Sequence, residues 1–134
     1  MRLLLDTHAL IWWLTDNKRL RAPERDAISD RETIVHVSAA TLWEISIKAS
    51  LGRIDADDKE LSARLEENAF VELPIMWRHG RRAGSLPRHH DDPFDRMLIA
   101  QAQQEQLILV SYDPAFRNYD VELMPISREH TESS

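Results

Sequence analysis

Short, unbroken apolar runs are the feature that most constrains how this chain can fold. Leu3-Leu4-Leu5 and Leu107-Ile108-Leu109-Val110 are apolar throughout, and residues 33–37 form a third run rich in β-branched side chains. Runs of this length are typical of strands buried on both faces, as in parallel sheets. Two further short strands are predicted at 71–73 and 121–124.

Segments of helical length separate these runs. Ser38 is the expected N-cap of one helix and Gly52 follows its end, while Gly84-Ser85-Leu86-Pro87 is expected to stop another. Strands that alternate with helices predict an α/β fold with a mostly parallel central sheet. The predicted helices cover residues 7–14, about 21–30, 39–51, 58–68, 75–83 and 93–106.

The size and composition of the chain fit one domain. Its 134 residues are 43% hydrophobic, which suffices for one core, so we expect a single domain over 1–127 and a flexible tail over 128–134. There is no cysteine, which excludes disulfides and thiolate metal sites. The opening apolar stretch is too short for a signal peptide or a membrane span. We therefore expect a cytoplasmic protein without a membrane partner.

Charge is unevenly distributed along the chain. The formal net charge of −6 disfavours a nucleic-acid partner, unless bound cations neutralise part of the acids. Residues 55–72 are strongly acidic, whereas residues 78–90 hold four arginines and no acid. We interpret this basic segment as a candidate RNA contact, with a solvated basic surface as the alternative. The arginines are Arg78, Arg81, Arg82 and Arg88.

Four acids from distant parts of the sequence are predicted to meet at one edge of the sheet. Asp6 and Asp113 each follow a predicted strand, and ligand sites in open α/β sheets lie beyond the carboxyl ends of the strands. The two acids would lie together if their strands are neighbours. Glu44 lies about two turns into the helix after the second strand, and Asp95 lies in the first turn of the helix at 93–106.

Each of these acids also has a purely structural interpretation. Asp6, Asp95 and Asp113 are placed where acids favour the start of a helix or turn, and Glu44 could pair with Lys48 at i+4. Glu44 distinguishes best between the structural interpretation and a metal site. Its helix is so apolar that we expect it to be buried around much of its circumference, which would keep Glu44 from open water. A buried carboxylate must be paired, hydrogen-bonded, protonated or bound to a metal. Clustered carboxylates suit Mg²⁺ or Mn²⁺, and these ions support phosphodiester hydrolysis.

Four segments in order resemble a known family. They are 3–8 (LLLDTH), 38–45 (SAATLWEI), 90–102 (HDDPFDRMLIAQA) and 109–116 (LVSYDPAF). Together they make the chain similar to a PIN-domain ribonuclease, and specifically to a VapC-type toxin of a bacterial or archaeal toxin–antitoxin pair. The resemblance runs from near residue 1 to about 118. It implies a three-layer α/β/α fold with a mostly parallel sheet.

The resemblance also implies a function and a site. It implies Mg²⁺-dependent endonucleolytic cleavage of RNA, with Mn²⁺ as a substitute, as well as inhibition by a cognate antitoxin and homodimerisation. The implied metal-site and catalytic acids are Asp6 and Asp95 as the chief ligands, with Glu44 and Asp113 in support. Two neighbours have both a functional and a structural interpretation, and the structural one is favoured. Ser111 fits a small hydroxyl residue of the family that could orient water or metal, or it ends the strand. Asp92 could support the metal through a water, or it is the N-cap of the helix that starts at Pro93.

Other enzymes fit the sequence less well. An aspartyl-nucleophile phosphatase of the haloacid-dehalogenase type usually carries a second Asp two positions after the first, where this chain has His8. A housekeeping RNA-processing nuclease of the same family would share the chemistry, and the short chain favours the toxin. A zinc site is disfavoured because no histidines are spaced at i, i+4, and we interpret the candidates as exposed loop residues. They are His36, His79, His89 and His90.

A binding module without catalysis is the remaining alternative. The chain has four tryptophans, which could form an apolar contact surface, although tryptophan is more often part of a core. They are Trp12, Trp13, Trp43 and Trp77.

Overall fold

The computed structural model describes residues 1–125, so the predicted domain end at 127 and the tail at 128–134 lie outside the described residues. Within this part, no helix is long and apolar enough to cross a membrane. The elements in chain order are β1 (Arg2–Leu5), α1 (Thr7–Leu14), α2 (Ala22–Ser29), β2 (Ile34–Ser38), α3 (Ala39–Ser50), α4 (Asp58–Glu67), β3 (Val71–Leu73), α5 (Trp77–Ser85), α6 (Pro93–Glu105), β4 (Ile108–Val110), the 3₁₀ helix η1 (Pro114–Asn118) and β5 (Leu123–Met124).

The five strands form one sheet in the order β3-β2-β1-β4-β5, and every neighbouring pair is parallel. The predicted parallel sheet is therefore confirmed. The first strand lies at the centre, and Leu5 is in register with Val110 of β4. The backbone N–H of Asp6 continues this pairing by donating to the Val110 carbonyl at 3.1 Å. The carboxyl ends of β1 and β4 thus lie side by side, where parallel sheets place their ligand sites.

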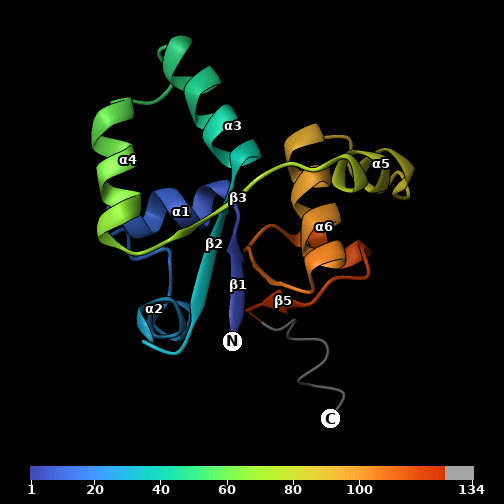
Figure 1. Cartoon of the computed structure of the whole chain (residues 1–134), viewed down its shortest axis with the longest axis horizontal. Coiled ribbons are helices and arrows are strands. Elements are labelled where there is room, and N and C mark those ends of the chain that lie inside the picture. The colour runs from blue at the N-terminus through green and yellow to red at the C-terminus, as the bar shows by residue number, and fades with distance from the viewer. Residues whose placement is uncertain (126–134) are drawn as a thin grey trace.

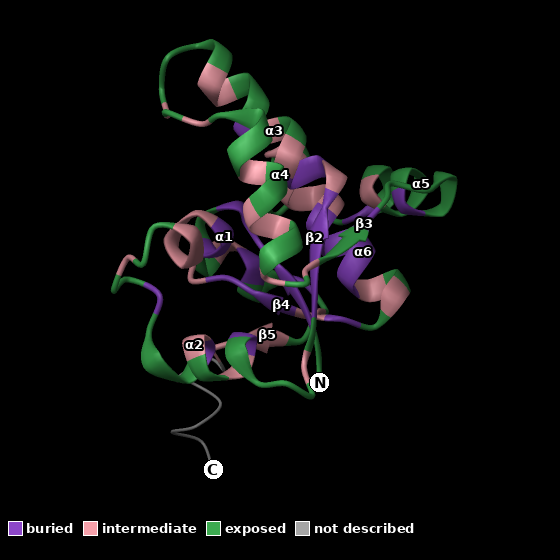
Figure 2. Cartoon of the chain, turned by 60° about the vertical axis from the view of Figure 1, so that its left-hand side comes forward, coloured by how far each residue is buried: buried purple, intermediate pink, exposed green. Residues whose placement is uncertain are grey.

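Helices cover both faces of the sheet, which confirms the three-layer arrangement (Figure 1). Because side chains alternate along a strand, Leu4 of β1 packs in one core with Leu98 of α6, whereas Leu3 and Leu5 pack in the other with Leu10 of α1. β1, β2 and β4 are largely buried, the edge strands β3 and β5 are less so, and the outer surfaces of the helices are exposed (Figure 2). Burial on both faces explains why the strands are short apolar runs rather than alternating ones.

The bounds predicted for the helix at 75–83 are wrong by two residues at each end. α5 begins at Trp77, because Met76 has an extended backbone and serves as the N-cap. Gly84 and Ser85 continue the helix, and it ends at Leu86, which is extended. The residue before a proline is biased away from helical backbone angles, and Pro87 supplies that bias.

The expectation that α3 is buried around much of its circumference is also wrong. Ala40 and Ile45 face the core, but Trp43 is 61% exposed and Leu51 is 60% exposed. The C-terminal half of α3 projects beyond the sheet (Figure 1), where Ile47 and the C-cap residue Leu51 are exposed. Trp43 lies in the first half of α3, and its ring packs edge-on against Phe94 of α6 at 5.1 Å. Trp77 on α5 is exposed as well.

Candidate metal centre

Asp6 lies between the end of the central strand β1 and the first turn of α1. It is the N-cap of that helix, and its Oδ1 accepts a hydrogen bond from the N–H of Ala9 at 2.7 Å. The side chain is buried, and burial raises the pKa of the Asp6 carboxyl, while contacts with Ser111 and the Ala9 N–H oppose the rise. Within residues 1–125 no ion pair neutralises Asp6. The predicted capping role is thus present, and the second carboxylate oxygen remains available.

Asp113 reaches the same edge from the end of β4. Its Oδ1 accepts from the N–H of Ala115 at 2.9 Å, which caps η1. Its own N–H donates to the hydroxyl oxygen of buried Ser111 at 3.1 Å. Because the Ser111 hydroxyl also contacts Asp6, Ser111 links the two acids as well as ending the strand.

Asp95 lies in the first turn of α6 and faces the ends of β1 and β4. Oδ1 of Asp92 accepts from the N–H groups of Phe94 and Asp95 at 2.9 and 3.0 Å, so the predicted N-cap is confirmed. Burial raises the pKa of Asp95 to about 6; a hydrogen bond from His90 lowers it, and the nearby charges of Asp92 and Asp6 raise it further. Because the charge of Asp6 raises the pKa of Asp95, the two carboxyl groups are close enough to interact electrostatically.

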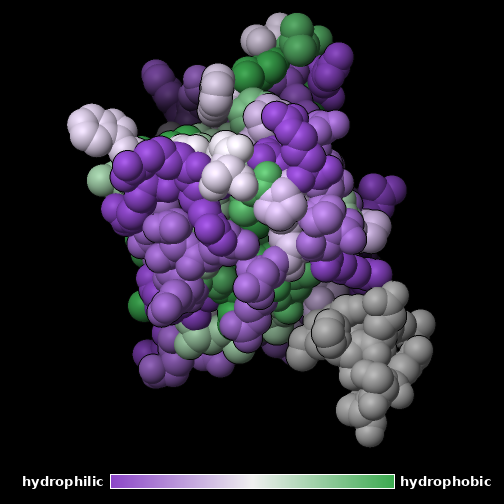
Figure 3. Space-filling model, turned by 90° about the vertical axis from the view of Figure 1, so that its right-hand side faces the viewer, coloured by the Kyte–Doolittle hydropathy of each residue, from purple (hydrophilic) through white to green (hydrophobic). Residues whose placement is uncertain are grey.

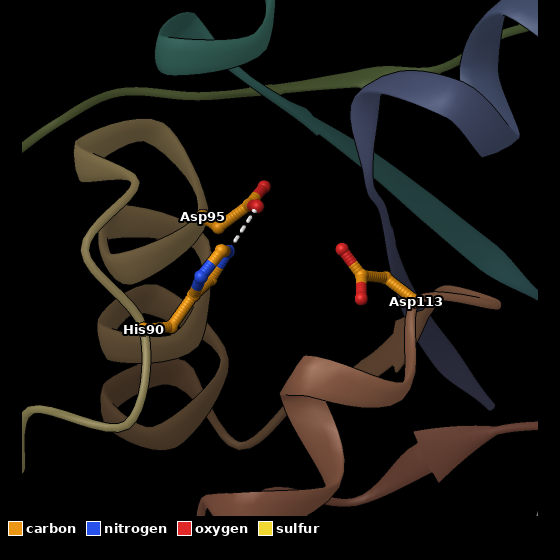
Figure 4. Close-up of side chains that lie close together, drawn as sticks. All are labelled: His90, Asp95 and Asp113. Atoms are coloured by element: carbon orange, nitrogen blue, oxygen red, sulfur yellow. Dashed lines mark hydrogen bonds and ion pairs between the residues drawn. The ribbon is translucent and has the colours of Figure 1, made fainter.

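His90 completes the closest group of side chains. Its Nε2 lies 2.7 Å from Oδ2 of Asp95. Single ligand atoms of His90, Asp95 and Asp113 all lie within 4.8 Å of one another, with Asp113 reaching toward the pair from the opposite side (Figure 4). The hydrogen bond with Asp95 raises the pKa of His90.

The interpretation of the histidines as exposed loop residues is therefore wrong for three of the four. His90 is half-buried in the site, although the sequence does place it five residues before Asp95 in a segment shared with the family. His36 is buried because it lies on β2, where its Nδ1 is 3.1 Å from the carbonyl oxygen of Leu3. His79 is buried between the N–H of Met76 and Glu105. Only His89 is exposed.

Glu44 is held beside the site rather than in its centre. The hydroxyl of Thr7 donates to Oε1 of Glu44 at 2.6 Å, and Lys48 forms an ion pair with Oε2 at 3.0 Å. The predicted i+4 pair is thus confirmed, and the Glu44 side chain is only 12% exposed. Thr7 directly follows Asp6, so Glu44 is tethered to the same helix start that positions the buried acid.

Arg96 is a positioning residue that the sequence interpretation missed. Its guanidinium donates to the carbonyl oxygens of Ala83, Leu86, Pro87 and His90 at 2.8 to 3.2 Å. These bonds fix the loop between α5 and α6 and so place His90 against Asp95. An arginine one residue after an acid in a helix gives no sequence signal of such a role.

The predicted RNA-contacting arginines spread along the α5 side of the molecule, a face that is mostly hydrophilic (Figure 3). Arg78 is ion-paired with Glu105 at 2.7 Å, and Arg82 donates to Gln103 at 2.7 Å, both near the C-terminal end of α6. Arg88 is exposed in the loop two residues before His90, and Arg81 is exposed on α5. Of the four, Arg88 is nearest in sequence to the acidic cluster.

The donor set at this edge fits a hard divalent cation. Oxygen ligands suit Mg²⁺ and Mn²⁺, and the group within 4.8 Å holds the carboxylates of Asp95 and Asp113 with the imidazole of His90. Asp6 lies outside that group, but its charge still raises the pKa of Asp95. Asp6 and Asp113 each use one oxygen for capping, which leaves the other for a ligand. Of the three aspartates, Asp6 and Asp95 are more deeply buried than Asp113, so a cation would relieve most of their desolvation cost.

The fold is shared with several solved structures, one of which, from Klebsiella pneumoniae, is a toxin–antitoxin complex. VapBC2 from Rickettsia felis, bound to a DNA fragment from their promoter, matches with a TM-score of 0.68 at 16% identity, over 92% of this chain and 97% of that chain. FitAcB from Neisseria gonorrhoeae gives 0.65 at 23%, over 92% and 96%. A complex from Klebsiella pneumoniae gives 0.66 at 19%, over 93% and 98%. These similarities establish the fold.

Sequence comparison gives the family directly. Comparison with curated proteins yields no match. The sequence model of the PIN domain matches residues 3–122, which is most of the chain and includes all four predicted acids. This chain belongs to the PIN domain family.

Proposed function

We propose that this protein is a Mg²⁺-dependent endoribonuclease, with Mn²⁺ as a substitute, and that it acts in the cytoplasm as the toxin of a toxin–antitoxin pair. The observation that carries the proposal is the group formed by Asp95, Asp113 and His90, whose ligand atoms lie within 4.8 Å of one another. Asp6 follows β1 at the same edge of the sheet, and repulsive charge couples it to Asp95 and Asp113. Membership of the PIN family supports nuclease activity.

Each side chain of the proposed metal centre has a separate role. Asp6 and Asp95 would be the chief metal ligands, with Asp113 and Glu44 in support. A divalent ion held there would lower the pKa of water and would stabilise charge on the attacking and leaving oxygens of a phosphodiester. Ser111 orients Asp6 and Asp113 relative to each other. His90 offsets part of the negative charge at Asp95 and holds that carboxylate toward the site.

RNA and protein partners belong to the same proposal. Arg88 would contact the RNA backbone near the site, with Arg78, Arg81 and Arg82 as further candidates, because phosphate contacts are made by basic side chains. One structural neighbour is a toxin–antitoxin complex, which supports a cognate antitoxin as the inhibitor. We also expect a homodimer.

The test of this function is cleavage of single-stranded RNA by the purified protein. We expect cleavage with Mg²⁺ or Mn²⁺, none with EDTA, and none by Asp6→Asn in either cation. Equal cleavage by wild type and Asp6→Asn would contradict the site. Growth arrest on expression, relieved by co-expressing the neighbouring reading frame, would separate a toxin from a housekeeping RNA-processing nuclease.

A further inference from the structure

Glu24 is a buried carboxylate that the proposed reaction does not use. It lies in the first turn of α2 and is 2% exposed, and within residues 1–125 no ion pair neutralises it. A buried carboxylate is costly unless it accepts hydrogen bonds. Its Oε1 accepts one from the phenol of Tyr112, a residue 88 positions away in the sequence.

Tyr112 is held from several sides by the first part of the chain. Its phenol oxygen also accepts from the N–H of Arg21 at 2.9 Å. The Arg21 guanidinium lies 4.7 Å from the centre of the Tyr112 ring, and the ring of Trp12 lies 5.7 Å from it. Burial and the bond to Glu24 raise the pKa of Tyr112 to about 12, so the phenol keeps the proton that it donates.

The backbone of Tyr112 lies between two residues of the candidate metal centre. Ser111 precedes it and contacts Asp6, and Asp113 follows it. β4 ends at Val110, and the Asp113 N–H donates to the Ser111 side chain rather than to a neighbouring strand. A fixed Tyr112 side chain therefore limits how the Asp113 segment can turn relative to Asp6.

We propose that Glu24 and Tyr112 form a positioning pair that orients Ser111 and Asp113 for cation binding. This inference depends on the proposed metal centre, to which neither Glu24 nor Tyr112 contributes a ligand. α2 has no other part in that centre, so Glu24 couples this helix to the site only through the phenol. Loss of the bond should weaken cation affinity by about 10-fold, as is typical for residues that orient metal ligands.

The experiment measures Mn²⁺ binding to the full chain by the EPR signal of free Mn²⁺. We expect Tyr112→Phe and Glu24→Leu each to raise the Kd for Mn²⁺ by about 10-fold. Glu24→Gln keeps an acceptor for the phenol and should stay within about 2-fold of wild type. Raising the Mn²⁺ concentration should restore RNA cleavage in Tyr112→Phe but not in Asp95→Asn.

Ile28→Val is the matched control on the same helix, since Ile28 is buried in α2 but contacts neither member of the pair by a hydrogen bond. It should lower the melting temperature without changing the Kd for Mn²⁺. A wild-type Kd in Tyr112→Phe or Glu24→Leu, or an equal loss in Ile28→Val, would overturn the positioning role. If wild type binds no Mn²⁺, or if Asp6→Asn binds it as well as wild type does, the proposed metal centre is contradicted. The positioning pair, which depends on that centre, is then contradicted too.

Discussion

The two ends of α6 carry acids in opposite electrostatic surroundings. Asp95 in the first turn is buried near other acids, and its pKa rises to about 6. Glu105 in the last turn accepts from Arg78 and His79, and these bonds hold its pKa below the ordinary value. The two residues are ten positions apart, or about 15 Å along the helix.

The difference separates Glu105, an acid that stabilises the fold, from Asp95, the acid that we propose as a metal ligand. Glu105 has a guanidinium and a buried imidazole as partners and joins α5 to α6. Asp95 has one half-buried imidazole, which does not offset burial and the charges of Asp92 and Asp6. A site with excess negative charge on a rigid edge is suited to bind a cation.

The largest expected effect comes from removing one charge at each end of the helix. Asp95→Asn should lower RNA cleavage by more than about 100-fold, since even residues outside the ligand shell cost about 10–100-fold. Glu105→Gln should keep activity near wild type but lower the free energy of unfolding by about 1 kcal/mol. Cleavage rates and urea unfolding measure the two effects. Equal activity losses in both variants would break the comparison.

The pH dependence of stability in cation-free buffer should differ in sign between the two acids. The pKa of Asp95 is raised in the folded protein. Its contribution to the free energy of unfolding is therefore fully present below about pH 4 and is lost as the pH rises through 6, a loss of at most about 3 kcal/mol. The pKa of Glu105 is lowered, so its contribution is present above about pH 4.5 and is lost as the pH falls. Unfolding free energies from pH 3 to 8, taken as differences between wild type and each of Asp95→Asn and Glu105→Gln, test both signs.

Cation binding should stabilise the end of α6 that carries Asp95. At a Mn²⁺ concentration 100 times the Kd, the free energy of unfolding should rise by about 2.7 kcal/mol. Glu105→Gln should show the same rise and Asp95→Asn almost none, as measured by thermal unfolding with and without Mn²⁺. A full rise in Asp95→Asn would place the cation elsewhere.

The smallest expected effect concerns RNA binding by two arginines: Arg88, in the loop before α6, and Arg78, which lies beside the C-terminal end of α6. Arg88→Gln should reduce the slope of log K against log salt concentration by about 0.7, the value for one phosphate contact with a single strand. Arg78→Gln should change stability more than the slope, because Arg78 is already paired with Glu105. Fluorescence anisotropy with Ca²⁺ in place of Mg²⁺ measures binding. Equal slopes for Arg88→Gln and wild type would remove Arg88 from the interface.

Local sequence predicted the sheet and the meeting of two acids well. Continuous apolar runs are what a doubly covered strand requires, and Asp6 and Asp113 had to meet once β1 and β4 were neighbours. The same reasoning placed Asp95 at this edge, although its position also depends on how α6 packs, and the family resemblance supported that placement.

Long-range contacts decide the features that the sequence did not predict. His90 joins the site because Arg96 fixes its loop through four carbonyl groups, and loop residues carry no periodic signal. The Glu24 to Tyr112 bond joins residues 88 positions apart. Trp43 is 61% exposed and packs edge-on against Phe94 of α6, an arrangement that the apolar pattern of α3 does not encode.

The most direct test of the metal centre is a crystal structure of the protein soaked in Mn²⁺, with anomalous scattering to locate the ion. We predict an anomalous peak between the carboxylates of Asp6 and Asp95, with Asp113 beside it, and no peak there in Asp95→Asn crystals. An ion bound only elsewhere, at a Mn²⁺ concentration that sustains RNA cleavage, would contradict the assignment of these carboxylates as the metal centre.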